Sequence, residues 1–398
     1  MRAVEESLTG SLDRLAFYRR LAPVANRLND EHTMVYPPGR DESVAVFPLG
    51  VAILEGRLWV SSAPPVDSGM RRGDELLSIN GRDTRSIIET LSTYYSGTGL
   101  RQKHAYLEWD FANALSQVLG MRSPFRVRFR NAADDQMGTA ELAGTSDVGP
   151  ERQAFSYQRV SEKTLLFSYN AFDDEEGRFD DFLANLFQVA TVEDIDALII
   201  DLRRNQGGAA EFGDQVISYL TDQPFTQLTR VDVTVSDAVK EEFLSYVPGF
   251  LRWLPVQYMH PFLRPLWTNE TGEIASIDFE PFAPDDALVR FNGDVYVLIG
   301  PGTMSSASLF AAAIKHYRLG TLVGENTGGF ATMYGNIIDA RLPNTGLKVW
   351  MPTSVVYGQG EGPVAPDHEV LLSVEDIAAG SDAVLEFTLD LVAERQNE

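Results

Sequence analysis

The sequence contains no cysteine among its 398 residues. Disulfide bonds, thiolate metal ligands and a cysteine nucleophile are therefore all excluded. Histidine is also scarce, with five in the chain. No His-x-x-x-His pair is present, and the acidic run DDEEGRFDD lacks the glycine position and spacing of a calcium loop, so we expect neither a metal site nor a cofactor.

Positive charge and long apolar runs are scarce as well. The formal net charge of −24 argues against nucleic acid as a partner, because phosphate binding requires a basic surface. No apolar run approaches the roughly 18 residues that span a bilayer, so no membrane span is expected. The opening stretch, MRAVEESLTG, also lacks the apolar segment of a signal peptide.

The order of patterns along the chain predicts three parts. Residues 1–43 carry apolar residues at helical spacing and are expected to form a helical cap. Residues 44–148 hold short alternating segments, turns and one short helix, which predicts a small, partly open β-barrel. Residues 149–398 alternate apolar strands with helices, which predicts an α/β core. The apolar residues that indicate the cap are Leu8, Leu12, Leu15 and Leu21.

The strands expected in the core are continuously apolar, which is typical of a parallel sheet buried on both faces. They are expected within 164–172, 196–208, 294–302 and 321–326, with helices at 178–190 and 305–320. In such sheets the chemistry lies where loops leave the C-terminal ends of the strands.

A long insertion, residues 226–290, interrupts the core and has an aromatic centre at 247–267. It is expected to form a helical hairpin that packs on the core. A lid or a partner surface is the alternative, because an exposed apolar patch of that size normally marks binding.

A serine-rich turn, GPGTMSSAS, separates an apolar strand from an alanine-rich helix. Ser305 lies at this junction, where its hydroxyl is exposed and free helix N–H groups point at any anion formed there. Serine is also a usual helix cap, so the local sequence leaves a nucleophile and a cap both open. The glycine turns in 201–208 and 322–335 end two other strands, and together the three turns predict one site.

Four motifs in order resemble the C-terminal processing, or tail-specific, serine peptidase family and its tricorn relatives. They are DLRRNQGG, GTMSSAS, VGE and the PD of VAPDHEV. The stretch SGMRRGDELLSINGRD, within residues 44–148, resembles the PDZ domain of that family. The resemblance implies a ClpP/crotonase-like α/β core with a mostly parallel sheet, a PDZ-like barrel and the N-terminal cap. It also implies a serine-type endopeptidase.

The family motifs assign roles to residues of this chain. The nucleophile of the family corresponds to Ser305. The oxyanion hole is implied to come from the Ser306 N–H and a glycine N–H of the DLRRNQGG turn, with Gly208 favoured and Gly207 left open.

The chain departs from the family at the base. Phe330 stands where many members have a lysine, and Lys315 lies roughly 15 Å along the same helix from Ser305. The segment LNDEHTMV resembles the D-G-H-T segment of the tricorn branch and implies that His32 is the base. Imidazole suits this role, because it titrates near neutrality and can move a proton both ways.

A third residue is needed to orient the imidazole. Glu361 lies near the position expected for the glutamate of the tricorn branch, and it is assigned this role. The other candidates are Glu325 and Asp367, and His368 is an alternative base.

The resemblance also implies the partner and the location. The substrate is expected to be an unstructured peptide or a protein C-terminus, bound by strand addition at a loop containing Leu49, Gly50 and Val51. Because relatives are mostly exported in bacteria, a periplasmic or extracellular location with the signal removed is expected, and a cytoplasmic one stays open. The oligomeric state is not predicted. The alternative function is an inactive member that binds an apolar ligand or a protein, as the missing lysine and the aromatic insertion favour.

Overall fold

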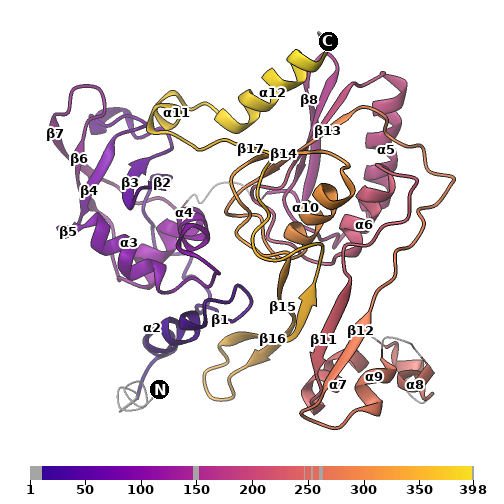
Figure 1. Ribbon diagram of the computed structural model, residues 1–398. Coiled ribbons are helices and arrows are strands. Elements are labelled where there is room, and N and C mark those ends of the chain that lie inside the picture. The colour runs from indigo at the N-terminus through magenta and orange to yellow at the C-terminus, as the bar shows by residue number, and fades with distance from the viewer. Residues whose placement is uncertain (1–10, 147–151, 246, 252–253, 260–262, 397–398) are drawn as a thin grey trace.

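The computed structural model describes residues 11–146, 152–245, 247–251, 254–259 and 263–396. Figure 1 shows a sheet with helices in the N-terminal half, a larger α/β core, and a long hairpin that extends from the core. Leu8 of the expected cap and part of the aromatic centre of the insertion lie outside the described residues. Among the described helices, none combines the length and apolarity needed to cross a membrane.

The core is built on a six-stranded sheet in the order β17-β14-β13-β10-β9-β8. Neighbouring strands are parallel except β8 and β9, which are antiparallel. The prediction of a mostly parallel sheet is therefore confirmed. The strands are β8 (Phe155–Ser161), β9 (Thr164–Tyr169), β10 (Ala197–Asp201), β13 (Asp294–Ile299), β14 (Thr321–Gly324) and β17 (His368–Glu369).

Helices cover both faces of this sheet, which explains why its strands are continuously apolar. Ile200 packs with α5, α6 and α10 on one face, whereas its neighbour Ile199 packs with α12 on the other. Successive side chains of a strand point to opposite faces, so both must be apolar here. The helices of the core are α5 (Phe179–Val192), α6 (Glu211–Ser218), α10 (Ser306–Tyr317), α11 (Val374–Ala379) and α12 (Ala383–Gln396).

The N-terminal sheet unit, as we call residues 46–142, holds a second sheet in the order β2-β3-β4-β6-β7, with β5 paired to β4. Its strands are β2 (Val51–Leu54), β3 (Arg57–Val60), β4 (Glu75–Ile79), β5 (Arg82–Asp83), β6 (Phe125–Arg130) and β7 (Met137–Leu142). Its helical segments are the 3₁₀ turn η2 (Val66–Ser68), α3 (Thr84–Ser92) and α4 (Leu100–Gln117). That this unit is PDZ-like stays a prediction.

The expectation of one short helix in this region is wrong, because α4 has 18 residues. The sequence of α4 does not show a helical apolar pattern. The polar residues Gln102, His104 and Ser116 are buried together with apolar ones such as Leu107 and Phe111. A helix that is covered on several sides has no clean apolar stripe.

A third sheet joins the N-terminal segment to the core and to the insertion. Its order is β1-β16-β11-β12, with β15 also paired to β16. Its strands are β1 (Met34–Val35), β11 (Arg230–Thr234), β12 (Ile274–Asp278), β15 (Thr332–Arg341) and β16 (Lys348–Tyr357). The helix of the N-terminal segment, α2 (Arg14–Ala25), continues into the 3₁₀ turn η1 (Asn26–Leu28).

The insertion is not a helical hairpin, and that prediction is wrong. Strands β11 and β12 pair antiparallel, and β11 also pairs with β16, so the insertion extends the third sheet. The sequence RVDVT alternates apolar and polar residues, and its two valines are buried. The helical segments lie between the two strands (Figure 1): α7 (Asp237–Ser245), η3 (Gly249–Leu251), α8 (Val256–Met259) and α9 (Arg264–Thr268).

Helix α5 offers a test of how the core is stabilised. Leu186 is fully buried between α5 and the sheet, whereas Val192 in the same helix is 75% exposed. We expect Leu186→Ala to lower the free energy of unfolding by about 2–5 kcal/mol, because it leaves a cavity. Val192→Ala is the matched control and should change it by less than about 0.5 kcal/mol. Urea unfolding of both variants measures the difference, and equal effects would contradict this packing.

Candidate active site

Ser305 lies between the end of β13 and the first residue of α10, as the sequence predicts. Its backbone has φ 53° and ψ −130°, a conformation that residues with a Cβ rarely adopt. Its hydroxyl makes no capping hydrogen bond to the helix. Backbone strain of this kind persists where the surroundings impose it, and a strained strand-to-helix turn exposes a serine hydroxyl for chemistry. The cap alternative therefore does not describe this side chain.

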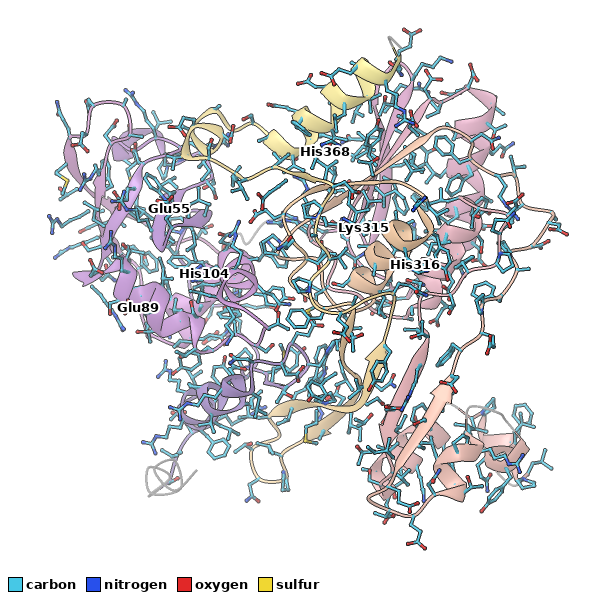
Figure 2. The ribbon with its side chains drawn as sticks, viewed as in Figure 1. Glu55, Glu89, His104, Lys315, His316 and His368 are labelled. Atoms are coloured by element: carbon cyan, nitrogen blue, oxygen red, sulfur yellow. The ribbon has the colours of Figure 1, made fainter. Side chains whose placement is uncertain are left out.

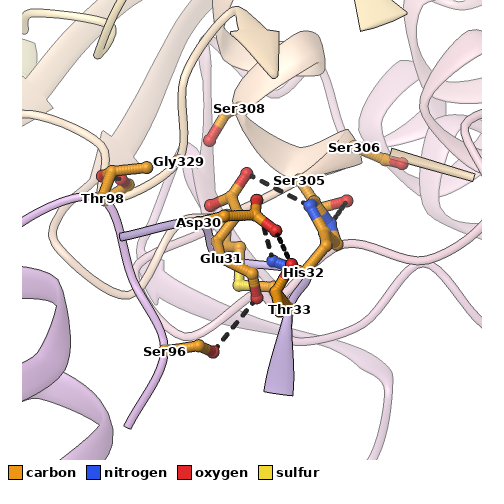
Figure 3. A network of polar contacts seen from close by, with 12 residues as sticks. Asp30, Glu31, His32, Thr33, Ser96, Thr98, Ser305, Ser306, Ser308 and Gly329 are labelled. Carbon is orange, nitrogen blue, oxygen red and sulfur yellow. Dashed lines mark hydrogen bonds and ion pairs between the residues drawn. The ribbon is translucent and has the colours of Figure 1, made fainter. Parts of the chain in front are cut away.

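His32 reaches Ser305 from the other end of the chain. Its Nε2 lies 3.0 Å from Ser305 Oγ, within hydrogen-bonding distance (Figure 3). The segment that carries it is fixed because β1 pairs with β16, with Met34 opposite Trp350. Within the segment, the His32 N–H and the Thr33 hydroxyl both donate to the Asp30 carboxylate. The position of His32 is thus fixed by the Asp30 hydrogen bonds on one side of it in the sequence and by the pairing of β1 on the other.

Burial controls the charge of His32, which is 2% exposed. Burial lowers the pKa of the imidazole, whereas the Asp30 charge and a main-chain hydrogen bond at Tyr334 raise it. A neutral imidazole can accept a proton at Nε2 only if its own proton is on Nδ1. In the described parts of the chain, Nδ1 makes no hydrogen bond of normal length and angle, so the main-chain contact with Tyr334 is at most a weak one for this atom.

A second buried acid lies beside the imidazole. Glu31 is 1% exposed, and its Oε1 lies 3.8 Å from His32 Nδ1. Its Oε2 accepts a 3.0 Å hydrogen bond from Gln102 Nε2 in α4. Burial raises the pKa of Glu31 to about 8; the nearby Asp30 charge also raises it, and hydrogen bonds from Gln102 and the Ser305 main chain lower it.

The glycine turn after β10 lies against the serine turn. A Cβ on Gly207 would be 2.7 Å from Ser305 Cβ and 2.9 Å from Ser306 N, so only glycine fits. The Gly207 N–H donates to Asn205 Oδ1 and is therefore used within the turn. The Gly208 N–H has no hydrogen-bond partner among the described residues, and the Gly208 carbonyl accepts from Ser306 Oγ at 2.7 Å. This arrangement favours Gly208 over Gly207 as a donor to an oxyanion beside Ser305.

The structure does not bring Glu361 to His32. The Ala331 N–H donates to the Gly362 carbonyl, and the Thr332 hydroxyl donates to the Gly360 carbonyl. The loop is held in this way on both sides of Glu361, and the Glu361 side chain is exposed. It lines a surface pocket with Lys315 and His316. No hydrogen bond or ion pair joins Glu361 to His32 in the described structure, so no contact supports the predicted orienting role.

The other residues considered for orienting His32 or for acting as the base make their contacts with other side chains. Glu325 pairs with Arg101 at 2.8 Å. Asp367 pairs with Lys315 at 2.9 Å. His368 is exposed on β17 and its ring contacts Phe387. Figure 2 shows Lys315 and His316 on α10 and His368 beside α12.

Few groups of the loop predicted to bind the peptide are free to contact it. Leu49 and Val51 are buried, and the Gly50 N–H already donates to Ser62 Oγ at 2.9 Å. Strand β2 is an edge strand, and its Ile53 N–H donates to Glu108 Oε1 of α4 at 2.7 Å. A peptide that paired with β2 at this position would have to displace Glu108.

Two residues of the site, Glu31 and Gln102, were not predicted from the sequence, because no sequence motif indicates their roles. Glu31 lies inside LNDEHTMV at the position where the similar segment D-G-H-T has glycine, and that difference was the available signal. Gln102 lies in α4, which the sequence does not reveal as a helix, and no signal pointed to it. No group of three or more His, Asp or Glu in the described residues is arranged to hold a metal ion.

The strain at Ser305 predicts a trade-off between function and stability. Ser305→Gly relieves the positive φ, whereas Ser305→Ala retains a Cβ and keeps the strain. We expect the glycine variant to be more stable than the alanine variant by about 1 kcal/mol. Parallel urea denaturation of the two variants measures this, and an equally stable or more stable alanine variant would refute it.

Comparisons with known proteins bear on the family and the fold of the chain. The family model described as Peptidase family S41 matches residues 163–361, half of the chain. The solved structure of mature CPAF complexed with lactacystin is 19% identical, with a TM-score of 0.67 over 98% of this chain and 90% of that one. Mature CPAF is 18% identical, with a TM-score of 0.68 over 98% of this chain and 89% of that one. The photosystem II D1 C-terminal processing protease is 15% identical, with a TM-score of 0.44 over 96% and 90%.

At these identities the likeness to the solved structures concerns the fold alone. No curated protein matches the chain. The match of the family model over half of the sequence shows that the chain belongs to peptidase family S41.

Proposed function

We propose that this protein is a serine peptidase in which Ser305 is the nucleophile and His32 the general base. The observation that carries the proposal is the 3.0 Å contact between His32 Nε2 and Ser305 Oγ at a strained turn. A nucleophile with a base in hydrogen-bonding distance is the constellation that acyl transfer requires.

In the first half of the reaction, His32 Nε2 takes the Ser305 hydroxyl proton as Oγ attacks the peptide carbonyl carbon. The carbonyl oxygen becomes an oxyanion, and the N–H groups of Gly208 and Ser306 stabilise it. His32 then gives its proton to the amide nitrogen, the C–N bond breaks, and the amine leaves. Ser305 remains as an ester of the substrate acyl group.

In the second half, water replaces the amine. His32 takes a proton from the water as its oxygen attacks the ester carbon, and the oxyanion forms again at the same donors. The C–O bond to Ser305 then breaks, the carboxylic acid leaves, and the proton returns from His32 to Ser305 Oγ. The cycle restores the starting state without a metal or other cofactor.

The substrate we propose is an unstructured peptide or a protein C-terminus that binds in extended form. Strand β2 provides a sheet edge for such binding, and α4, which lies along it, also contacts the site through Gln102. The alternative of an inactive binding module is not favoured, because a base lies beside Ser305 although the family lysine is missing.

A fluorophosphonate probe tests the assignment, because it labels an activated serine whatever the substrate. Ser305→Ala should abolish labelling. His32→Ala should slow it by about 10²- to 10⁴-fold, the usual contribution of a general base. His368→Ala is the matched histidine control and should label like the unmodified chain. Labelling that persists in Ser305→Ala, or is lost only in His368→Ala, would show that the assignment is wrong.

A further inference from the structure

Two buried polar atoms lie close together beside the proposed nucleophile and base. Glu31 Oε1 and His32 Nδ1 each lack a hydrogen bond of normal length and angle in the described structure, and they lie 3.8 Å apart. The Tyr334 main chain is the other group that contacts the ring. An unpaired buried polar atom is unfavourable, so a small approach of these two groups would satisfy both. Catalytic hydrogen bonds are often long without substrate and shorten when substrate binds.

We propose that Glu31 is the positioning residue for His32, accepting the Nδ1 proton and stabilising the imidazolium that forms when Nε2 takes the proton of Ser305. This inference rests on the proposed peptidase function. It gives to Glu31 the role that the sequence assigned to Glu361.

Glu31 is held in place by the N-terminal sheet unit. Gln102 Oε1 accepts the Thr98 N–H at 2.7 Å, and this bond turns Gln102 Nε2 toward Glu31 Oε2. The Thr98 hydroxyl in turn donates to the Gly328 carbonyl at 2.7 Å. With Oε2 fixed by Gln102, Oε1 is the atom left to contact the imidazole.

The glycine turn after β14 makes room for the carboxyl group. A Cβ on Gly329 would lie 2.8 Å from Glu31 Oε2 and 2.6 Å from Ser308 Oγ. The Asp30 carboxylate accepts the His32 N–H and the Thr33 hydroxyl, so among the described residues its hydrogen bonds are with the main chain and Thr33 rather than with the imidazole ring. In the similar D-G-H-T segment a glycine occupies the position of Glu31, so the resemblance does not imply this role and only the residues of this chain support it.

The surroundings of Glu31 determine when it is charged. The groups that face it are Asp30 and His32 of its own segment, Gln102 and Tyr106 of α4, and the Ser305 main chain. Burial raises the pKa of Glu31 to about 8, so the carboxyl is mostly protonated at pH 7 and ionises as the pH rises through 8. Only the ionised form stabilises an imidazolium, so the rate of the Ser305 reaction should rise over that interval.

The test compares Glu31→Gln with the matched variant Glu361→Gln in the full chain. The rate constant of fluorophosphonate labelling is measured from pH 5.5 to 9.5, with Ser305→Ala as the blank and thermal unfolding as the check of folding. We expect the unmodified chain and Glu361→Gln to gain rate as the pH rises through about 8. Glu31→Gln should lack this rise and label about 10-fold or more slowly at pH 9, and Glu31→Asp should restore part of it.

A second readout does not depend on activity. In a chain labelled with ¹⁵N-histidine, the His32 ring signals, assigned by their loss in His32→Gln, should shift as Glu31 ionises near pH 8. The shift should be absent in Glu31→Gln and present in Glu361→Gln. If Glu31→Gln keeps both the pH-dependent rate and the shift, or if Glu361→Gln loses them, the inference is overturned. If the NMR shift depends on Glu31 but Ser305 is never labelled, the peptidase proposal fails while the contact between Glu31 and His32 stands.

Discussion

The pairing of β1 with β16 is the contact on which the site depends. Strand β1 has two residues, and it attaches the N-terminal segment to a long strand of the third sheet. His32 lies two residues before Met34, the first residue of β1, and contacts a serine 273 residues away in the sequence. Ser305 itself is positioned by the core sheet, so the site exists only where two parts of the chain that are far apart in the sequence meet.

The N-terminal sheet unit also contributes to this meeting point through α4. Arg101 pairs with Glu325 of the core at 2.8 Å, and the Trp109 ring lies so close to Gly302 that no side chain would fit there. Gln102 of the same helix holds Glu31. The helix whose Glu108 accepts the Ile53 N–H of β2 therefore also supports the segment that carries the proposed base. Burial of Gln102 is explained by its contact with Glu31, whereas Ser116 of the same helix accepts a hydrogen bond from Arg122 within the N-terminal sheet unit.

Glycine and burial together set the chemistry of the site. Gly207 allows the turn after β10 to touch Ser305, and Gly329 allows Glu31 to lie beneath the serine turn. Burial disfavours charge on both Glu31 and His32, so each is neutral over part of the physiological range. A neutral imidazole can act as a base, and a buried acid beside it can respond to the charge that forms there.

The sequence alone predicted the α/β core and the strand-to-helix turn that carries Ser305, and the family resemblance assigned that serine as the proposed nucleophile. Apolar strands with no polar face require a parallel sheet covered on both sides, and the serine and glycine turns had to gather at the C-terminal ends of those strands. The short D-E-H-T segment was enough to name His32. Only the tertiary structure decided which carboxyl lies beside it, because that choice depends on packing between segments far apart in the chain. Glu361 is turned outward by the pairing of its loop, whereas Glu31 is enclosed by α4 and the glycine turns, and no local pattern in the sequence records either enclosure.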